Sequence, residues 1–568
     1  PPPPPVIHTP PPPTHTRDSI RRQRQMCIRD RDRIDEVFID KIVGLVDEFI
    51  SGKVARAEKW NEEDIILITY GDSILKDDEA PLETLHGFLK KYLKEEINIV
   101  HILPFYPFSS DDGFSVIDYL EVNPKLGNWE DIVSISKDFD LMADLVINHI
   151  SQHSNWFQNY LEDKDPGKGF FIEVDPGTDL SKVVRPRSLP LLTAFNTRNG
   201  KKHIWTTFSD DQVDLNFSNP EVLYEMLRVL LYYISIGSRI IRLDAIAFLW
   251  KKIGTDCLHQ PETHEMVKLM REMAEMADPD VIILTETNVP NLENLSYFGK
   301  GDEAHMVYQF SLPPLLLHAL FSGNTHYLSQ WAGTIPDPGP GCTFFNFTAS
   351  HDGIGVRPLE GLLPDDEFSS LAEGMKRNGA HISTRRRPDG SDSPYEMNIT
   401  FFDALKSSVN GGEEQQVRRF LCSQAIMMSM KGIPAFYIHS LTATPNYVEG
   451  VKITGRARTI NRRKWKLDEL NLSPWNESPQ SIVFNELKDL IKTRKKQAAF
   501  HPGGAQEVLD LGNDFFAFKR ISDEQSIFVV ANFSSATKTI RSDNLDDFPN
   551  NCIDLISGMT FQNGQEIS

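Results

Sequence analysis

Eight short apolar runs recur along most of the chain, each bounded by polar turns and separated from the next by amphipathic segments. Apolar runs of this length are typical of β-strands, and their alternation with helical segments indicates βα units around a parallel sheet. Eight such strands close into a (β/α)8 TIM barrel, the α/β fold that we predict. The expected strands span residues 64–72, 97–105, 140–149, 238–245, 281–287, 305–310, 342–350 and 432–439.

The segments between and after these runs predict further parts. The first residues are rich in proline and then arginine, with almost no periodic apolar pattern, so we interpret them as a non-native or disordered leader rather than a polyproline recognition arm. The last part alternates short strands, which indicates a small antiparallel β domain, and its final letters NGQEIS show no obvious closing strand, so we expect it to be truncated. The predicted parts are the leader (1–33), the first part of the barrel (34–149), an inserted domain rich in Pro, Gly and Asp (150–205), the second part of the barrel (206–498) and the C-terminal β domain (499–568).

Composition narrows the class of protein. The 568 residues are 40% hydrophobic and 10% aromatic, which indicates a well-packed globular protein. A formal net charge of −21 disfavours nucleic acid and anionic membranes as partners. No apolar run reaches the roughly 18 residues that a membrane span needs, and no signal-type segment opens the chain, so we expect a cytoplasmic protein. The five cysteines lack metal-ligand spacing and are expected to be free thiols: Cys27, Cys257, Cys342, Cys422 and Cys552.

Three of the apolar runs lead into an acid: Asp244 in RIIRLDA, Glu286 in VIILTET and Asp352 in FFNFTASHD. Each acid alone could be a polar residue where a strand reaches water. In a TIM barrel, however, the carboxyl ends of the strands meet at one face, where active sites are built. Two carboxyl groups that flank a glycosidic bond are what retaining sugar chemistry requires, so the three acids are candidates for one catalytic site.

Polar companions accompany these acids. Arg242 lies two residues before Asp244, and residues two apart on a strand share a face, so its guanidinium can keep the carboxylate ionised. Asn148 and His149 close another run, and His351 directly precedes Asp352.

These residues fall in four short stretches that resemble the α-amylase family of retaining α-glucoside enzymes (glycoside hydrolase family 13): 144–149, 240–248, 284–288 and 347–352. The resemblance implies that Asp244 is the nucleophile, Glu286 the acid and base, and Asp352 the transition-state stabiliser. It also implies a small irregular domain after the third strand.

Segments outside the four stretches resemble the sucrose phosphorylase subfamily, and within it the branch that acts on phosphorylated or acidic glucosides. They include LITYGDS (67–73), FYPFSSDDGFSVIDY (105–119), VVRPRSLPLLT (183–193) and ARTINR (457–462). The resemblance implies a glycosyltransferase of carbohydrate metabolism that cleaves an α-glucoside, such as glucosylglycerate, sucrose 6′-phosphate or sucrose, with inorganic phosphate to give α-glucose 1-phosphate. It further implies that Asp72 and Arg462 hold the far hydroxyls of the glucosyl unit, while His149 and His351 contact hydroxyls near the reacting carbon. From the residues alone, Asp72 could be a turn or cap residue and Arg462 a solvated charge.

A phosphate ion approaching three acids needs guanidinium groups, which stay charged and bind phosphate in a bidentate manner. Two clusters stand out in this acidic chain: Arg185 with Arg187, and the triplet at 385–387 in a loop between the last two strands. Arg187 matches the family's phosphate-contacting arginine. His381 and Arg385 are further candidates, for phosphate or for an anionic acceptor group, and the triplet could equally be a solvated loop.

The triplet and Asn291 depart from the form expected in the branch. They leave the acceptor open among glycerate, fructose 6-phosphate, fructose and glycerol. A hydrolase or transglucosidase with the same catalytic residues is the first alternative, and a non-catalytic barrel that binds a ligand is a second. We expect no cofactor and no metal, although Asn148 occupies a position that helps to bind calcium in some relatives. The expected partners are a small α-glucoside and inorganic phosphate, and the expected assembly is a monomer or a homodimer.

Overall fold

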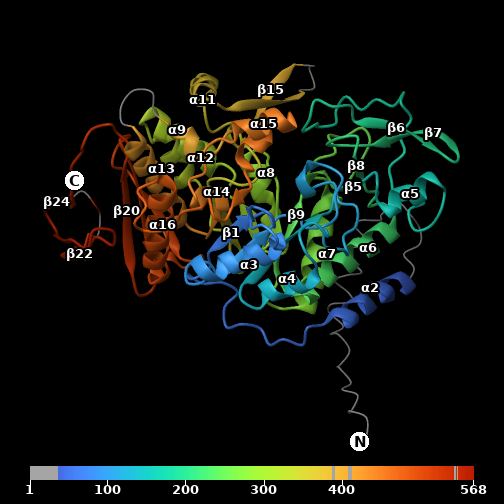
Figure 1. The fold of residues 1–568 in the computed structure, drawn as a ribbon, viewed down its shortest axis with the longest axis horizontal. Coiled ribbons are helices and arrows are strands. Elements are labelled where there is room, and N and C mark those ends of the chain that lie inside the picture. Colours follow the sequence, from blue (N-terminus) through green and yellow to red (C-terminus); the bar gives the residue numbers. More distant parts are fainter. Residues whose placement is uncertain (1–35, 387–390, 407–411, 543–544, 546–547, 568) are drawn as a thin grey trace, which may run out of the picture.

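A closed barrel of eight parallel strands lies at the centre of the computed structural model (Figure 1). The structure describes residues 36–386, 391–406, 412–542, 545 and 548–567, so the leader expected at 1–33 lies outside the described residues. The barrel strands are β1 (Ile66–Thr69), β3 (Ile99–Ile102), β4 (Asp140–Val146), β9 (Ser238–Asp244), β10 (Ile282–Thr285), β11 (Met306–Tyr308), β12 (Thr343–Phe347) and β16 (Ile433–Tyr437). Around the barrel their order is β1-β16-β12-β11-β10-β9-β4-β3. Each lies within one of the eight predicted runs, so the predicted TIM barrel is confirmed.

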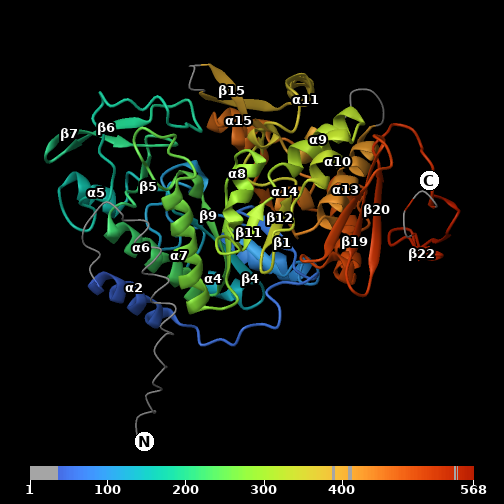
Figure 2. The same cartoon turned by 180° about the vertical axis from the view of Figure 1, so that it is seen from behind.

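Helices cover the outside of the barrel (Figures 1 and 2). The longer ones are α2 (Glu36–Phe49), α3 (Pro81–Tyr92), α4 (Trp129–Ser136), α6 (Pro220–Ser235), α7 (Pro261–Ala277), α9 (Leu312–Ser322), α10 (His326–Gly333), α13 (Glu413–Ser429) and α16 (Pro479–Lys495). The shorter ones are α8 (Asn291–Leu295), α12 (Phe401–Ala404), α14 (Ile438–Leu441) and α15 (Val448–Thr454). None of the described helices is long and apolar enough to cross a membrane.

Helix α6 shows how the sequence sets one βα unit. Its start is fixed by the Asn219 side chain, which accepts a hydrogen bond from the backbone N–H of Glu221, and by Pro220 at the first helical position. Buried leucines at 223, 227 and 230 follow the helical period and face the core. Beyond the helix, Gly237 has a φ of 104°, a left-handed conformation that favours glycine, and the chain turns into β9.

The segment inserted after β4 forms a separate small body beside the barrel, drawn at the right of Figure 1. It contains α5 (Asn155–Leu161) and the antiparallel pair β6 (Leu192–Thr197) and β7 (Gly200–Trp205). A second pair, β5 (His149–Ser151) and β8 (Gln212–Asp214), connects it to the barrel. Its own small apolar core includes Val174, Val183, Leu191 and Trp205.

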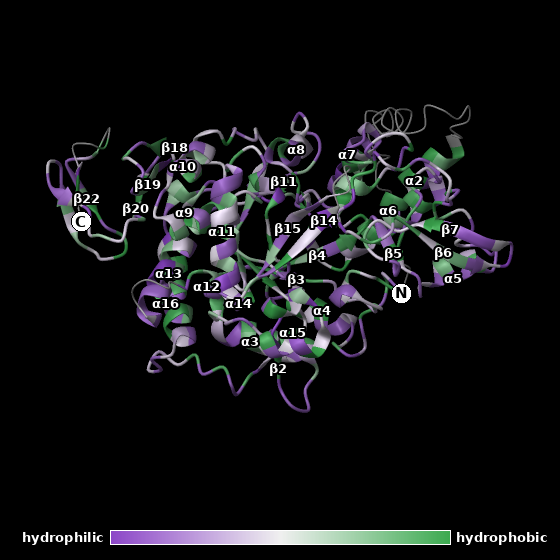
Figure 3. Ribbon diagram, turned by 90° about the horizontal axis from the view of Figure 1, so that it is seen from above, coloured by the Kyte–Doolittle hydropathy of each residue, from purple (hydrophilic) through white to green (hydrophobic). Residues whose placement is uncertain are grey.

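A three-stranded sheet lies above one end of the barrel, where Figures 1 and 3 both place β15. Its order is β13 (Ile354–Gly355), β15 (Asp392–Asn398) and β14 (His381–Arg386), and α11 (Asp365–Arg377) precedes it. The sequence analysis placed the arginine triplet in a loop. The structure instead places Arg385 and Arg386 in strand β14, paired with β15, while Arg387 lies outside the described residues.

The C-terminal part contains the antiparallel sheet β18 (Ala505–Leu509), β19 (Phe515–Ile521) and β20 (Ser526–Asn532). Two smaller pairs follow: β21 (Ile540–Arg541) with β24 (Glu566–Ile567), and β22 (Asn551–Ile553) with β23 (Thr560–Gln562). The strands predicted near 514–521 and 526–534 are present. Strand β24 pairs with β21, although the sequence pattern near the end of the chain showed no obvious closing strand.

Candidate active site

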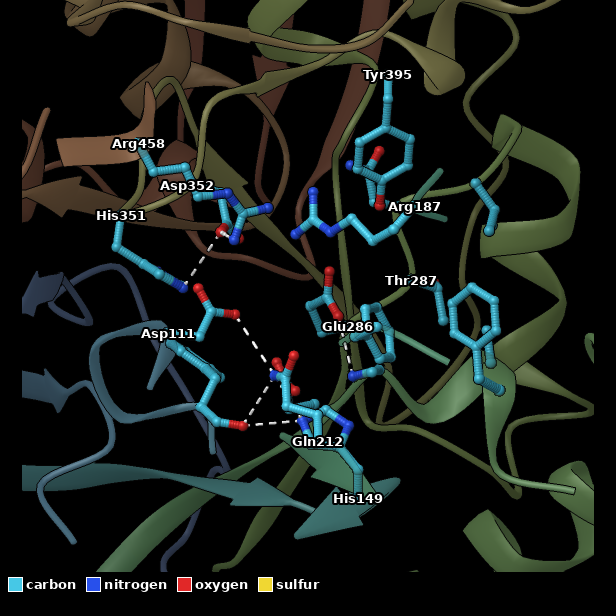
Figure 4. A pocket seen from close by; sticks show the side chains of 18 residues that line it. Asp111, His149, Arg187, Gln212, Glu286, Thr287, His351, Asp352, Tyr395 and Arg458 are labelled. Atoms are coloured by element: carbon cyan, nitrogen blue, oxygen red, sulfur yellow. Dashed lines mark hydrogen bonds and ion pairs between the residues drawn. The ribbon is translucent and has the colours of Figure 1, made fainter. Parts of the chain in front are cut away.

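Three acids at the carboxyl ends of the barrel strands β9, β10 and β12 line one cavity (Figure 4). Asp244 is the last residue of β9, Glu286 follows β10 directly, and Asp352 lies in the turn after β12. The structure therefore brings together the three carboxyl groups that the sequence analysis grouped. The other residues that line the cavity are Asp111, Phe114, His149, Arg187, Phe208, Gln212, Ala245, Ala247, Phe248, Thr287, Asn288, Val289, His351, Tyr395 and Arg458.

Arg242 makes the contact with Asp244 that their spacing predicts. Its Nη1 lies 2.7 Å from Asp244 Oδ1, and the same nitrogen donates to Asp144 on the adjacent strand β4. Arg242 Nε donates to the Tyr308 hydroxyl at 3.1 Å. One buried guanidinium thus contacts two buried carboxyl groups, an arrangement that is stable only when the partners are well placed.

His101 contacts the Asp144 carboxylate of this ion pair. Its Nε2 lies 2.6 Å from Asp144 Oδ2, and both side chains are buried. Burial raises the pKa of Asp144, but Arg242 and His101 outweigh burial and bring the pKa to about 2. Asp144 is therefore ionised at neutral pH and holds Arg242 in place.

Asp244 and Glu286 differ in their hydrogen bonds. Burial raises the pKa of Asp244 well above its usual value, which Arg242 opposes and Glu286 reinforces. Burial also raises the pKa of Glu286, with a further contribution from Asp352. Because both pKa values are raised, each of the two carboxyl groups loses its proton at a higher pH than an isolated carboxyl group would. Asp244 has the direct ion pair, whereas Glu286 accepts a hydrogen bond at 3.0 Å from the backbone N–H of Ala245.

Asp352 has its own arginine, which the sequence analysis missed. Arg458 Nη1 lies 2.5 Å from Asp352 Oδ1, and the same guanidinium binds Glu396 at 2.8 and 3.1 Å. Although burial raises the pKa of Asp352, Arg458 is the strongest of the cations that bring it below its usual value. Arg458 lies in ARTINR, four residues before Arg462, so the motif itself was the available signal.

Two histidines line the cavity in neutral form. Burial lowers the pKa of both His149 and His351. His149 Nε2 lies 2.9 Å from the carbonyl oxygen of Phe114, and the His351 ring stacks on the Phe114 ring with centroids 4.7 Å apart. A neutral imidazole has one donor and one acceptor, which suits contacts with sugar hydroxyls.

Asn148 lies behind His149 and contacts a lysine. Its Oδ1 accepts a hydrogen bond at 2.6 Å from Lys251 Nζ, which is also 2.6 Å from Asp214 Oδ2. Thr207 Oγ1 donates to the same Asp214 oxygen at 2.6 Å. The amide oxygen that the sequence analysis connected with calcium is therefore bonded to an ammonium group. Among the described residues, no group of three or more His, Cys, Asp or Glu is arranged to hold a metal ion.

Arg187 reaches the cavity from the inserted segment. Its guanidinium lies 5.6 Å from the centroid of the Tyr395 ring, within cation–π range, and Figure 4 shows it projecting between Arg458 and Tyr395. Arg185 does not line the cavity, and it donates to the carbonyl oxygens of Ser188 and Leu189. Of the two arginines in VVRPRSLP, only Arg187 faces the three acids.

Besides Arg242, four other predicted site residues lie outside the cavity wall. Asp72 forms an ion pair with Lys464. Arg462 Nε donates to the His351 carbonyl oxygen at 2.8 Å, and its Nη2 lies 3.8 Å from Asp352 Oδ1. His381 begins β14 with an exposed side chain, and Arg385 pairs with Glu360 at 2.7 Å.

Three further cavity residues, Asp111, Gln212 and Tyr395, were not predicted from the sequence. Asp111 belongs to a segment that the sequence analysis quoted but to which it gave no role, and its φ of 52° is in the left-handed region, as is often found at functional sites. Gln212 and Tyr395 come from strands β8 and β15, which were not among the predicted strands.

Known proteins resemble this chain over most of its length. A family model described as the alpha amylase catalytic domain matches residues 70–328. The glucosylglycerate phosphorylases of Spirochaeta thermophila and Escherichia coli are 49% and 47% identical, covering 84% and 79% of this chain and 81% and 80% of theirs. The crystal structure of sucrose 6F-phosphate phosphorylase from Thermoanaerobacter thermosaccharolyticum has a TM-score of 0.73 at 28% identity, covering 83% of this chain and 94% of that one.

Proposed function

The chain belongs to the α-amylase family, and from that premise we propose that it is a retaining phosphorylase that cleaves glucosylglycerate with inorganic phosphate. The products are α-glucose 1-phosphate and glycerate. The observation that carries the proposal is the meeting of Asp244, Glu286, Asp352 and Arg187 in one cavity. The choice of donor is supported by relatives of 46 to 49% identity that are named glucosylglycerate phosphorylase.

Asp244 is the nucleophile in this proposal. When the two groups carry one proton, we place the charge on Asp244, because its direct ion pair with Arg242 at 2.7 Å opposes the effect of burial on its pKa. Its carboxylate attacks the anomeric carbon and forms a covalent β-glucosyl-enzyme as the bond to the glycerate oxygen breaks.

Glu286 holds the proton. As the glycosidic bond breaks, it donates that proton to the departing oxygen, and it recovers one from phosphate in the second half of the reaction. The raised pKa of Glu286 supports this role, since a general acid must remain protonated near the working pH. Asp352, kept ionised by Arg458, stabilises the positive charge that develops on the sugar ring.

Arg187 binds the incoming phosphate. The ion must come close to three carboxyl groups, and a guanidinium at the cavity wall lowers the electrostatic cost of that approach. Arg187 supplies it from a segment other than the barrel, so phosphate and glucosyl unit are held by different parts of the chain.

The remaining residues contact the sugars. His149 and His351 bind hydroxyls near the reacting carbon, while Asp72 and Arg462 bind the far hydroxyls. For Asp72, this role requires that substrate displace Lys464 from its carboxylate. His381 and Arg385 are assigned to the anionic group of the acceptor or to phosphate.

We also propose that the chain is divided into the parts predicted from the sequence. The parts 34–149 and 206–498 form the barrel, 150–205 the inserted domain and 499–568 the C-terminal β domain. The free thiols of Cys257, Cys342, Cys422 and Cys552 support a cytoplasmic location, where thiols remain reduced. Monomer or homodimer remains the predicted assembly.

One experiment tests the function. Release of glucose 1-phosphate is measured from glucosylglycerate, sucrose 6′-phosphate and sucrose, each with and without inorganic phosphate. We expect phosphate-dependent release, fastest from glucosylglycerate. Free glucose formed equally well without phosphate would make the protein a hydrolase, and release from sucrose alone would change the acceptor.

A further inference from the structure

Two buried arginines lie side by side at the edge of the sheet that covers the barrel. Arg357 opens the 3-10 helix Arg357–Leu359 directly after β13, and Arg385 is in β14. Their side chains are only 8% and 13% exposed. Burial lowers the pKa of Arg357, and the charge of Arg385 lowers it further, as expected for two cations close together.

Two glutamates lie near this pair of arginines, but they are more exposed to solvent than the arginines are. Glu360 Oε1 lies 2.7 Å from Arg385 Nη2 but 3.8 Å from Arg357 Nε, which is too long for a hydrogen bond. The other nearby acid, Glu293, lies 3.1 Å from His259 Nε2. Both glutamates have side chains that are nearly half exposed, at 47% and 44%. The two guanidinium groups are therefore largely buried, whereas the carboxylates that could neutralise them are near the surface.

Each arginine has an unused donor. Among the described residues, the Nε of Arg357 and the Nε of Arg385 are both buried without a hydrogen-bond partner. A buried charged donor without a partner is costly, and arginines normally avoid this state. Two such donors on adjacent guanidinium groups are suited to a planar or tetrahedral oxyanion, which guanidinium groups bind in a bidentate manner.

The pair is connected to the cavity through Tyr395. The backbone N–H of Val356, the residue before Arg357, donates to the Tyr395 carbonyl oxygen at 3.1 Å. The Tyr395 ring lines the cavity and contacts the Arg187 guanidinium. Arg357 and Arg385 therefore lie next to the part of the sheet that carries Tyr395, just outside the residues that line the cavity.

We propose that Arg357 and Arg385 together bind one oxyanion next to the cavity wall formed by Tyr395. This inference rests on the proposed function, and it adds Arg357 and a defined geometry to the general role assigned to Arg385. The oxyanion is either the carboxylate of the glycerate unit or inorganic phosphate, which present the same chemistry to a pair of guanidinium groups.

Steady-state kinetics of Arg357→Met and Arg385→Met test the proposal. The matched control is Arg377→Met, which removes an exposed charge at the end of α11. We expect roughly a ten- to hundredfold rise in one KM, the range for losing a charge-assisted hydrogen bond, with kcat changed less than about threefold. A rise in the KM of glucosylglycerate alone identifies the carboxylate, and a rise in the KM of phosphate alone identifies phosphate. Both KM values equal to those of the control would overturn the proposal.

Thermal unfolding separates binding from a structural role. If the arginines serve an absent anion, replacing either by methionine leaves Tm equal to that of the wild type or higher, because a poorly compensated buried charge is removed. A lower Tm together with a parallel loss of kcat would overturn the proposal. Arg385→Lys keeps the charge but not the planar fork, so it is expected to show most of the KM defect.

Direct binding distinguishes this inference from the proposed function. If the wild-type protein releases no glucose 1-phosphate from any donor, the proposed function fails. The site is then tested by calorimetry with glycerate and with inorganic phosphate separately. At least tenfold weaker binding of one of the two anions to Arg357→Met than to the wild type supports the site, and equal binding of both to the two proteins overturns it.

Discussion

Arg242 is the residue on which the charge of Asp244, the proposed nucleophile, depends. Its guanidinium contacts Asp244 and Asp144, and His101 holds Asp144 from the other side. The two-residue spacing of Arg242 and Asp244 in the sequence was enough to predict their contact, because alternate side chains of a strand share a face. The participation of Asp144 could not be predicted in that way, since it depends on the register between β4 and β9.

Arg187→Met is expected to damage phosphorolysis more than hydrolysis. The variant retains Asp244, Glu286 and Asp352, so the glucosyl-enzyme still forms, but phosphate loses its cation. We expect kcat/KM for phosphate to fall roughly a hundredfold, consistent with a lost charge-assisted hydrogen bond. Glucose release by water, measured in the same assay without phosphate, is expected to change less than about threefold.

Arg185→Met provides the control, because Arg185 comes from the same segment but does not line the cavity. Equal losses of phosphorolysis and hydrolysis in Arg187→Met would remove its phosphate role.

The dependence of activity on pH is expected to follow from the raised pKa values of Asp244 and Glu286. Because burial raises both pKa values, both limbs of the kcat/KM profile are expected at higher pH than for isolated carboxyl groups. Below the lower limb both groups are protonated and the nucleophile is lost. Above the upper limb Glu286 is ionised and the acid is lost.

Glu286→Gln is expected to remove the upper limb when an activated donor such as glucosyl fluoride, which needs no acid, is used. An upper limb that persists unchanged in this variant would assign it to another group. The matched Asp244→Asn variant is expected to have no measurable turnover with any donor.

Arg458 could not be predicted from the sequence because its role depends on contacts with distant segments. Arg458 is one of several cations in the segment GRARTINRRK, and nothing in that run tells which side chain turns inward. In the structure Arg458 is the cation that turns inward, because its guanidinium forms ion pairs with Asp352 and Glu396. Contacts between segments that are far apart in the sequence are set by tertiary packing rather than by a local sequence pattern.

At the scale of elements, the barrel strands were predictable and the β14–β15 hairpin was not. Barrel strands are buried on both faces, so they appear as continuous apolar runs such as IILT and TFFNF. Strand β14 reads HISTRR, with polar residues on both faces and a register shift after Ser383. Such a strand has the composition of a loop, and its pairing with β15 is what makes it a strand.

Lys251 is expected to hold the connection between β5, β8 and the barrel. Its ammonium bonds Asn148 and Asp214, and both side chains of the ion pair are buried. In Lys251→Met the Asp214 carboxylate stays buried without its cation, and we expect the free energy of unfolding to fall by about 3–5 kcal/mol. Chemical denaturation of the purified variant measures this loss.

Lys252→Met is the neighbouring control, because the Lys252 side chain is 59% exposed and its nearest acid, Glu262, is 3.9 Å away. An exposed pair of this kind contributes little, so the control is expected to be as stable as the wild type. Similar stability of the two variants would show that the Lys251 ion pair does not stabilise the connection.

At the scale of the whole molecule, the cavity is assembled from four parts of the chain. The barrel supplies the three acids, the inserted segment supplies Arg187, the sheet above the barrel supplies Tyr395, and the segment after α15 supplies Arg458. Figure 1 shows that the inserted segment and the sheet approach the barrel from different sides. A complete site therefore requires that all four parts be folded and docked.

Ligand binding is expected to slow amide hydrogen exchange in all four parts together. In Asp244→Asn, which cannot turn over, saturating glucosylglycerate with phosphate is expected to protect the segments around Arg187, Tyr395 and Arg458 as well as the barrel ends. Exchange in β18–β20, which lie outside the cavity, serves as the internal control. Protection confined to the barrel strands would mean that the outer segments do not close on the substrates.

The division of the cavity wall among distant segments has an evolutionary consequence. Asp244, Glu286 and Asp352 are anchored on strands whose lengths and register cannot vary without opening the barrel. The segments that carry Arg187, Tyr395 and Arg357 are connections, in which insertions and substitutions are tolerated. Changes in the connections alone can therefore alter which acid or sugar is released from the glucosyl unit. The residues that act on the glucosyl unit itself are inherited unchanged.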